Sequence, residues 1–367
     1  MIRLSFVGDI CLGLGAWNQR RWDPWSGVRE AFKASDEIIG NLECCLVDHR
    51  CNDAERNHRM AVPAAAVRHL EDLRLHATGL ANNHILDCGP RGLEATREAL
   101  ESAGIEHFGA GPDLATAGAV RIRNVHGQRI AYLGACDLSR YFAGRRRAGV
   151  VPMRRRLLLA AVSEARTQSD LVVVHLHGDL EFTPHPSPSR QRLARALVDA
   201  GADLVIQHHP HVIQGVETYH HGLIAYSLGN FLFKVHGNRY QERYPGTRTG
   251  LIIHVDWDAG AAPAHRWRWS VEPTGITDRH ATVLLEGRER TAVLSHFADL
   301  CYGLREPPVV RKAWRRRSTA RLKDQLWWAY YDITKGRPAR AIRDLGRCVT
   351  HSEDRAWLIG ALTAGRR

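Results

Sequence analysis

Short apolar runs alternate with longer helix-like stretches along most of the chain. The apolar runs predict strands at Ile2–Val7, Glu37–Leu42, His76–Leu80, Arg129–Gly134, Leu171–Leu176 and Leu204–Gln207. Helices are predicted between several of them, at Pro63–Leu73, Arg91–Ala103, Arg154–Gln168 and Ser187–Ala200. Strands that alternate with helices are typical of α/β folds.

The pattern changes between Gln214 and about Ser270, where strand-like runs follow one another without helices between them. These runs are GVETYHHGLIAYSLGNF (215–231), GLIIHVDWD (250–258) and HRWRWSV (265–271). We therefore expect a mixed sheet or a sandwich rather than a plain doubly wound sheet.

After about Glu286 the pattern becomes helical again and rich in arginine. Helices are predicted at Arg288–Leu304, Val309–Thr334 and Pro338–Val349, and they carry Trp314, Trp327 and Trp328. We therefore divide the chain into a main domain, residues 1–285, and a basic, Trp-rich helical region, residues 286–367.

Two interpretations of this helical region stay open. Residues 320–347 mix Arg and Lys with Trp and Tyr, so residues 310–349 could associate with an anionic membrane surface or a synthesis complex. The other interpretation is that the aromatic side chains dock on the main domain and the arginines are solvated. We favour docking, because Trp and Tyr commonly pack as anchors.

The charge balance indicates an anionic partner. Lys and Arg total 51 against 39 for Asp and Glu, which gives a net charge of +12. Such an excess attracts phosphates, acidic polymers, nucleic acid or a membrane surface. The chain carries no recognised nucleic-acid motif, so we do not expect nucleic acid among its partners.

Cysteine usage and the first residues bear on location. The eight cysteines show no CxxC pairing and no regular framework, which is typical of reduced thiols in an intracellular protein. MIRLSFVGDI leads directly into a strand and lacks the signal-peptide pattern. No apolar run approaches the roughly 20 residues of a membrane-spanning helix. The expected location is cytoplasmic, with peripheral membrane contact as the alternative.

Polar clusters recur where the predicted strands end. They are Gly8-Asp9, Asn41-Leu42-Glu43, LANNHILDCG (80–89), HLHGDLE (175–181) and IQHHPHVIQG (206–215). In α/β folds the carboxyl ends of strands open into loops that carry binding groups. The clusters supply Asp, Glu, Asn and His, which suit Mn, Fe, Zn or Mg, and no Ser or Cys stands out beside a base.

Two such cations polarise a phosphoryl oxygen and activate water, while a neighbouring histidine protonates the leaving group.

Each cluster also has a structural interpretation. Asp9 and the NLE run could cap helices, and Asn82 could hold a left-handed turn. His175 and His177 share one face of a strand, but one of them could be a core histidine. The HHPH histidines are the hardest to explain by packing, because burying polar rings without partners is costly. The five clusters together favour a metal site.

The motifs resemble those of the CapA family. GDICLG, NLECCL, LANNHILDCG, HGDLE, GADLVIQHHPHVIQG and YSLGNFLF occur in the family's order, between about Leu4 and Phe233. These capsule-synthesis proteins, associated with poly-γ-glutamate, resemble the calcineurin-like metallophosphoesterases. The resemblance implies an α/β four-layer sandwich, in which helices flank two mixed sheets and two divalent metal ions, Mn, Fe or Zn, lie at the strand ends. The C-terminal helical appendage lies outside it.

The resemblance also implies roles for individual residues. The implied metal ligands are Asp9, Glu43 as the bridging carboxylate, Asn83, His177, His209 and His211. His84 is the implied catalytic acid. Asp87, Glu181, His208 and Asn230 are expected to support the ligands or substrate, with Glu181 also a candidate ligand.

The chain departs from the family pattern in three places. Asp179 stands where the family usually has Gly, so the loop could change shape or gain a carboxylate. Gln207 replaces a small residue before the histidines. Cys11 replaces the histidine ligand of the wider superfamily; we favour a packing role for it over ligation, because buried free Cys is common.

Three functions are compatible with these features. The first is a metal-dependent hydrolase, phosphoesterase-like, that acts on an anionic or phosphorylated small molecule or polymer in capsule or other cell-surface polymer biosynthesis. The second keeps the metals but cleaves or forms amide bonds on γ-glutamyl or peptide substrates. The third is a non-enzymatic component of a polymer synthesis or export complex.

Overall fold

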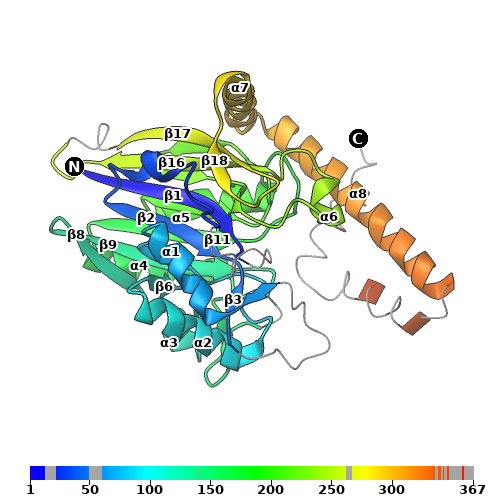
Figure 1. The fold of residues 1–367 in the computed structure, drawn as a ribbon, viewed down its shortest axis with the longest axis horizontal. Helices are drawn as coiled ribbons and strands as arrows, with labels where there is room; N and C mark the ends of the chain where they lie inside the picture. Colours follow the sequence, from blue (N-terminus) through cyan, green and yellow to red (C-terminus); the bar gives the residue numbers. More distant parts are fainter. Residues whose placement is uncertain are drawn as a thin grey trace.

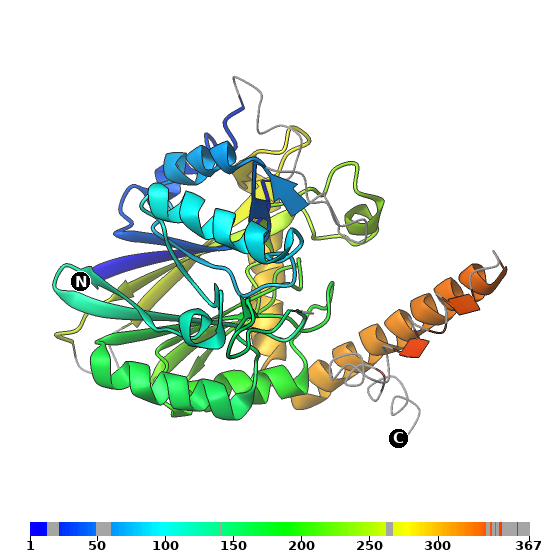
Figure 2. The same cartoon turned by 90° about the horizontal axis from the view of Figure 1, so that it is seen from below.

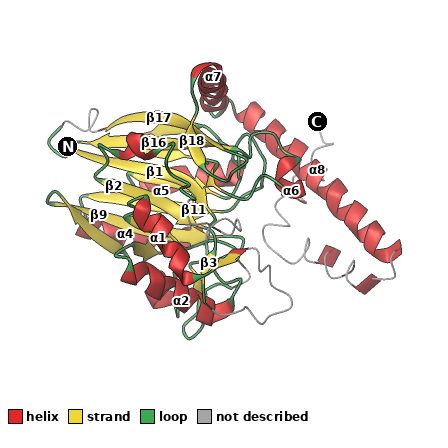
Figure 3. Ribbon diagram, in the orientation of Figure 1, coloured by secondary structure: helices red, strands yellow, loops and turns green. Residues whose placement is uncertain are grey.

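Two β-sheets face each other at the centre of this computed structural model, and helices cover their outer faces (Figures 1 and 3). The structure describes residues 1–12, 22–48, 60–139, 141–261 and 267–334, with 338–339, 342, 345–346 and 358 beyond them. The predicted α/β sandwich of two mixed sheets flanked by helices, with helices at the C-terminal end, is confirmed.

The first sheet mixes parallel and antiparallel pairs. Its strands in spatial order are β18 (Thr282–Leu284), β17 (Trp267–Ile276), β16 (Thr249–Trp257), β1 (Ile2–Ile10), β2 (Glu37–Leu42), β5 (Ala77–Gly79) and β6 (Glu106–Phe108). Strands β1, β2, β5 and β6 are parallel, whereas β16, β17 and β18 continue the sheet antiparallel. Strand β15 (Asn230–Leu232) joins the end of β1 in parallel.

The second sheet is parallel at its centre and antiparallel at both edges. Its order is β13 (Val216–Tyr219), β14 (Gly222–Ala225), β12 (Leu204–His208), β11 (Leu171–His177), β9 (Gln128–Cys136) and β8 (Arg121–Val125). Two short ladders pair β3 (Cys45–Leu46) with β4 (Ala61–Val62) and β7 (Ala110–Gly111) with β10 (Gly149–Val150).

Alternation along the strands produces the layers. In β11, Leu171 and Val173 pack between the sheets, while Val172 and Val174 pack against the outer helices. Those outer helices are α4 (Arg155–Gln168) and α5 (Pro188–Asp199), and α1 (Arg68–Asp72) with α2 (Gly89–Ser102) cover the first sheet, as Figure 2 shows. Burying each such aliphatic side chain stabilises the folded state by about 1.5–3 kcal/mol. The alternation of side chains along the strand therefore determines which strand face packs against the other sheet and which packs against the helices.

Two predicted segments differ from the structure. Pro63–Leu73 is a 3-10 turn, η3 (Ala64–Val67), followed by the short α1, because i to i+3 bonds such as Ala66 N to Pro63 O close the first turn. The expected run of strands is interrupted by α6 (Arg239–Glu242), which the Asn238 side chain caps by accepting from Tyr240 N. The remaining short helices are η1 (Arg29–Phe32) and α3 (Leu114–Ala117).

Two helices follow the last strand. In α7 (Gly287–Gly303), Phe297 and Leu300 complete the core between the sheets, and α8 (Pro307–Thr334) then extends away from the body (Figures 1 and 2). The boundary at residue 286 stays a prediction, and the helix predicted at Pro338–Val349 lies largely outside the described residues.

The aromatic side chains of α8 do not share one environment. Trp314 and Leu322 pack against Leu180, but Trp327 is 56% exposed. Docking on the main domain therefore describes Trp314, and for the more exposed Trp327 it stays a prediction. No helix among the described residues is long and apolar enough to cross a membrane. Association through residues 310–349 stays a prediction.

Among the cysteines that the structure describes, Cys88 differs from the expectation. Cys11, Cys44, Cys45, Cys136 and Cys301 are in no disulfide, whereas Cys88 is disulfide-bonded. The expectation of eight reduced thiols is therefore wrong. Disulfides persist mainly in oxidising compartments, so this bond does not favour the cytoplasmic location, which stays a prediction.

Close contact between β1 and the residue before β15 generates a test of the fold. A Cβ at Gly8 would overlap the carbonyl oxygen of Gly229, which also accepts from Asp9 N at 3.0 Å. We expect Gly8→Ala to lower the free energy of unfolding by about 1–3 kcal/mol, because backbone must move. The exposed turn residue Gly260 offers a control, and Gly260→Ala should stay within about 0.5 kcal/mol of wild type in chemical denaturation. Equal stability of the two variants would contradict the prediction.

Candidate metal centre

The sequence-predicted ligands converge at one edge of the two sheets. Asp9 lies in β1, Glu43 directly follows β2, and Asn83 and His84 lie in the loop after β5; His177 ends β11, and His209 and His211 follow β12. The parallel strands that carry these residues bring their carboxyl ends to the same edge.

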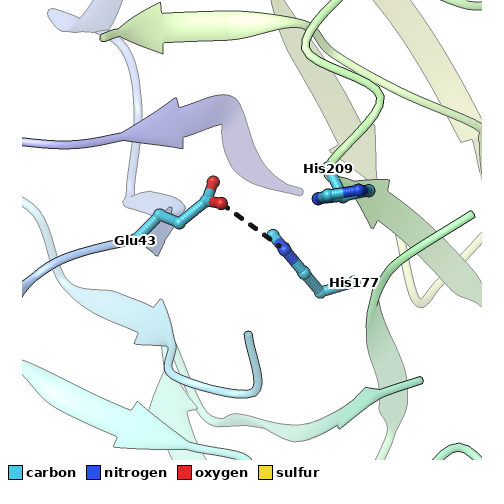
Figure 4. A group of neighbouring side chains, drawn as sticks. All are labelled: Glu43, His177 and His209. Carbon is cyan, nitrogen blue, oxygen red and sulfur yellow. Dashed lines mark ion pairs between the residues drawn. The ribbon is translucent and has the colours of Figure 1, made fainter. Parts of the chain in front are cut away.

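The possible ligand atoms form two groups that share Glu43. One group contains Glu43, His177 and His209, and the other contains Asp9, Glu43 and His211; within each, the atoms lie within 4.8 Å of one another. Figure 4 shows the first group, whose side chains point toward one another. Glu43 Oε1 lies 3.6 Å from His177 Nε2 and 4.0 Å from His211 Nε2. These acidic and histidine groups could hold a metal ion.

Unpartnered polar atoms test whether a cation fits this site. Both carboxylate oxygens of Glu43 are buried without a hydrogen-bond partner, as is His209 Nδ1. Burial, reinforced by the neighbouring Asp9 carboxylate, raises the pKa of Glu43 well above its usual value. Buried polar atoms are normally satisfied, because leaving them bare is costly. A divalent cation among imidazole and carboxylate donors would satisfy them, and this donor set suits Mn, Fe or Zn.

Asp9 is held as a carboxylate by donors around it. Asn41 Nδ2 donates to its Oδ1 at 2.9 Å, and the backbone N of His209 donates to its Oδ2 at 3.2 Å. Burial alone would raise the pKa of Asp9, but hydrogen bonding from His208 and His211 keeps it well below the usual value. The charged form, which a metal ligand needs, is therefore favoured here.

His208 lies behind Asp9 rather than among the ligand groups. Its Nδ1 is 3.3 Å from Asp9 Oδ1, and its Nε2 is 3.2 Å from His175 Nδ1. His175 is buried against Phe6 and Phe108, and burial lowers its pKa. His208 thus lies between Asp9 and His175, and its supporting role stays a prediction, while His175 packs in the core.

The HHPH turn adopts an unusual backbone. His209 and His211 have φ values of 93° and 57°, in the left-handed region that non-glycine residues rarely adopt. Each such residue costs about 1–3 kcal/mol and persists only where the surroundings impose it. His211 is oriented by Asn230, whose Oδ1 lies 2.9 Å from His211 Nδ1. Burial opposes a charge on His211, but Glu43 and Asp9 raise its pKa to about 10.

His84 stands at the open side of the site, on a loop that Asn82 shapes. Asn82 Oδ1 accepts from the backbone N of His84 and of Ile85, at 3.1 and 2.9 Å, without the left-handed φ considered for it. His84 Nδ1 hydrogen-bonds Asp87 Oδ2 at 2.9 Å, and its Nε2 lies 3.9 Å from Glu43 Oε1. Asn83 Oδ1 accepts from His177 Nε2 at 2.7 Å.

A cavity of about 400 Å³ opens beside these residues. Its wall consists of Cys11, Met60, His84, Glu181, His211, Phe233, Lys234, Gly237, Asn238, Tyr240 and Gln241. Glu181 Oε1 lies 4.0 Å from His211 Nε2, and Tyr240 OH donates to Glu181 Oε2. Cys11 contacts Met60, with its Sγ 3.4 Å from the Met60 sulfur, and lies outside both ligand groups.

The structure also places the other two departures from the family pattern. Asp179 has a φ of 80°, a left-handed conformation that glycine adopts without strain. Its side chain accepts from the backbone N of Ser187 at 2.7 Å and is in neither ligand group. Gln207 is buried within β12.

Sequence reasoning missed several residues of the site. Asn41 was considered from the sequence only as part of the NLE run. In the structure its Nδ2 donates a hydrogen bond to Asp9 and lies 3.3 Å from His177 Nδ1. Its position two residues before Glu43 was the available signal. Tyr240 and Lys234 carried no signal, because a four-residue helix and a loop are too short to show a periodic pattern.

Comparisons with known proteins identify relatives of the chain. The family model for the bacterial capsule synthesis protein PGA_cap matches residues 3–235. The chain is 34% identical to the capsule biosynthesis protein CapA of Bacillus anthracis over 245 residues, 63% of this chain and 60% of that protein. It is also 34% identical to the PGA biosynthesis protein CapA of Bacillus subtilis, over 64% of this chain and 63% of that one. The chain thus spans less than two thirds of the length of these relatives.

A hypothetical protein from Thermus thermophilus superimposes with a TM-score of 0.45 and 16% identity, over 78% of this chain and 100% of that chain.

The place of Asn41 between two ligand candidates generates a test of the site. We expect Asn41→Ala to weaken Mn²⁺ binding about 10–100-fold, because Asp9 loses a donor and His177 a neighbour that orients it. Isothermal titration calorimetry measures the affinity. Asn124→Ala is the matched control, because Asn124 only caps an exposed turn by accepting from Gly127 N. Wild-type affinity in a folded Asn41→Ala protein would contradict the assignment.

Proposed function

The chain belongs to the bacterial capsule synthesis protein family PGA_cap, and from this premise we propose that it is a metal-dependent hydrolase of the phosphoesterase type. Its place would be capsule or other cell-surface polymer biosynthesis, with an anionic or phosphorylated substrate. The observation that carries the proposal is the Glu43 carboxylate, buried and unpartnered where two groups of ligand atoms meet.

Six residues would hold two divalent ions, Mn, Fe or Zn. They are Asp9, Glu43, Asn83, His177, His209 and His211. Such ions, when bound, polarise a phosphoryl oxygen and activate water at neutral pH. The chain's own part is to keep Asp9 charged through its donors, to fix His211 through Asn230, and to place Glu43 between both groups.

Proton transfer falls to His84. Asp87 hydrogen-bonds Nδ1 and orients the ring, which leaves Nε2 as the atom that would pass a proton into the cavity that His84 lines. Donating this proton to the leaving oxygen breaks the ester bond without releasing an unstable alkoxide. Lys234 on the same cavity wall supplies a positive charge for an anionic substrate.

A second function rests on the same residues. The Bacillus subtilis relative is named for PGA biosynthesis, which favours cleavage or formation of γ-glutamyl or peptide amide bonds as the alternative. Comparing products from γ-glutamyl oligomers with those from phosphomonoesters and phosphodiesters separates the two chemistries.

A non-enzymatic role in a synthesis or export complex would instead be favoured if a variant without the site complemented the loss of the gene.

His84 provides the sharpest test of turnover against metal binding. We expect His84→Ala to keep its metal content and to lose about 10²–10⁴-fold in kcat, because only the proton donor is removed. Metal analysis by plasma mass spectrometry and hydrolysis of a phosphoester panel measure the two effects. His126→Ala, at an exposed histidine bonded to Asp36, should match wild type in both. The proposal fails if the wild type takes up no transition metal on reconstitution, and the role of His84 fails if its variant keeps full turnover.

A further inference from the structure

Helix α8 contacts the loop beside the candidate metal centre, where Trp314 and Leu322 pack against Leu180 and Arg317 makes a hydrogen bond. Arg317 Nε donates to the backbone O of Glu181 at 2.9 Å, across 136 positions of sequence. Glu181 lines the cavity, and α8 lies beyond residues 3–235, the part that matches the family. A segment outside the family-matched region therefore touches the wall of the site.

The guanidinium group of Arg317 is held by aromatic rings as well as by this bond. Its central carbon lies 4.8 Å from the ring centroid of Tyr244 and 5.5 Å from that of Phe182. The two rings stack with centroids 4.0 Å apart and planes 12° from parallel, and Arg317 Nη1 donates to Tyr244 OH at 3.2 Å. A planar guanidinium can stack and donate at once, which a lysine ammonium cannot.

The segment that Arg317 contacts needs external support. Phe182 has a φ of 58°, a strained conformation for a bulky residue. Its backbone N donates to Pro210 O at 2.8 Å, so the segment is tied to the turn that carries His209 and His211. Strained backbone persists only where surrounding contacts over-determine it, and Arg317 with Tyr244 supplies those contacts.

We propose that Arg317 is a positioning residue, which locks Glu181–Phe182 so that the Glu181 carboxylate faces the metal centre. Arg317 holds the backbone of Glu181, Tyr240 holds Oε2, and Oε1 remains 4.0 Å from His211 Nε2. Arg317 itself belongs to neither ligand group and is not among the residues that line the cavity. The inference rests on the proposed metal-dependent function, to which it adds a requirement for α8.

Mn²⁺ affinity, measured by isothermal titration calorimetry on the full chain, tests the proposal. We expect Arg317→Ala to weaken Mn²⁺ binding by about tenfold, in the range for residues that orient ligands, and Arg317→Lys to recover only part of the loss. Arg316→Ala, at the exposed neighbouring position, is the matched control and should bind as wild type does. Faster hydrogen exchange at residues 180–183 in Arg317→Ala alone should accompany the weaker binding.

A double-mutant cycle separates positioning from a general structural effect. If Arg317 acts through Glu181, Arg317→Ala should change Mn²⁺ affinity little in a Glu181→Gln background, whereas a general loss of structure would add to it. Wild-type Mn²⁺ affinity in folded Arg317→Ala, or full additivity in the cycle, would overturn the proposal. Absence of Mn²⁺ binding by the wild type would instead overturn the proposed function, so the two failures are distinguishable.

Discussion

The buried carboxylate of Glu43 is the constraint on which the rest of the site depends. A charged group removed from water costs several kcal/mol unless opposite charge or donors replace the lost hydration. Glu43 has no hydrogen-bond donor among the described residues, and its neighbours Asp9 and Glu181 are themselves acidic. The surrounding histidines lie close to Glu43 but do not hydrogen-bond it. Bound cations would supply the opposite charge that this carboxylate lacks.

Support for the ligand groups comes from outside them. Asp9 accepts a hydrogen bond from Asn41 and lies beside His208, which in turn contacts His175. His211 hydrogen-bonds Asn230. These contacts keep the rings and carboxylates oriented, which a metal site needs as much as the ligands themselves. The left-handed backbone at His209, His211 and Phe182 shows that the fold accepts local strain to present these groups together.

Much of this fold and site could be predicted from the sequence, for identifiable reasons. Strands such as β2 and β11 are continuous buried runs, and their ends carry the polar clusters, so position indicated where the site lies, whereas the resemblance supplied the individual ligand candidates. The pair His175 and His177 shows the limit of that reasoning. Both side chains lie on the same face of β11, but His175 packs against Phe108 in the core and His177 lies beside Glu43. The alternation of side chains along a strand cannot distinguish these two environments.

Sequence by itself determined the α/β class, the order of the strand-end motifs and the residue types that could bind metal, because these follow from local periodicity and chemistry, while the resemblance added the four layers. Only the tertiary structure decided which of those side chains meet, that His208 stands behind Asp9, and that Arg317 reaches Glu181 from a distant helix. Such contacts join segments far apart in the chain. They depend on how two sheets and a helix pack in space, and no local pattern records that packing.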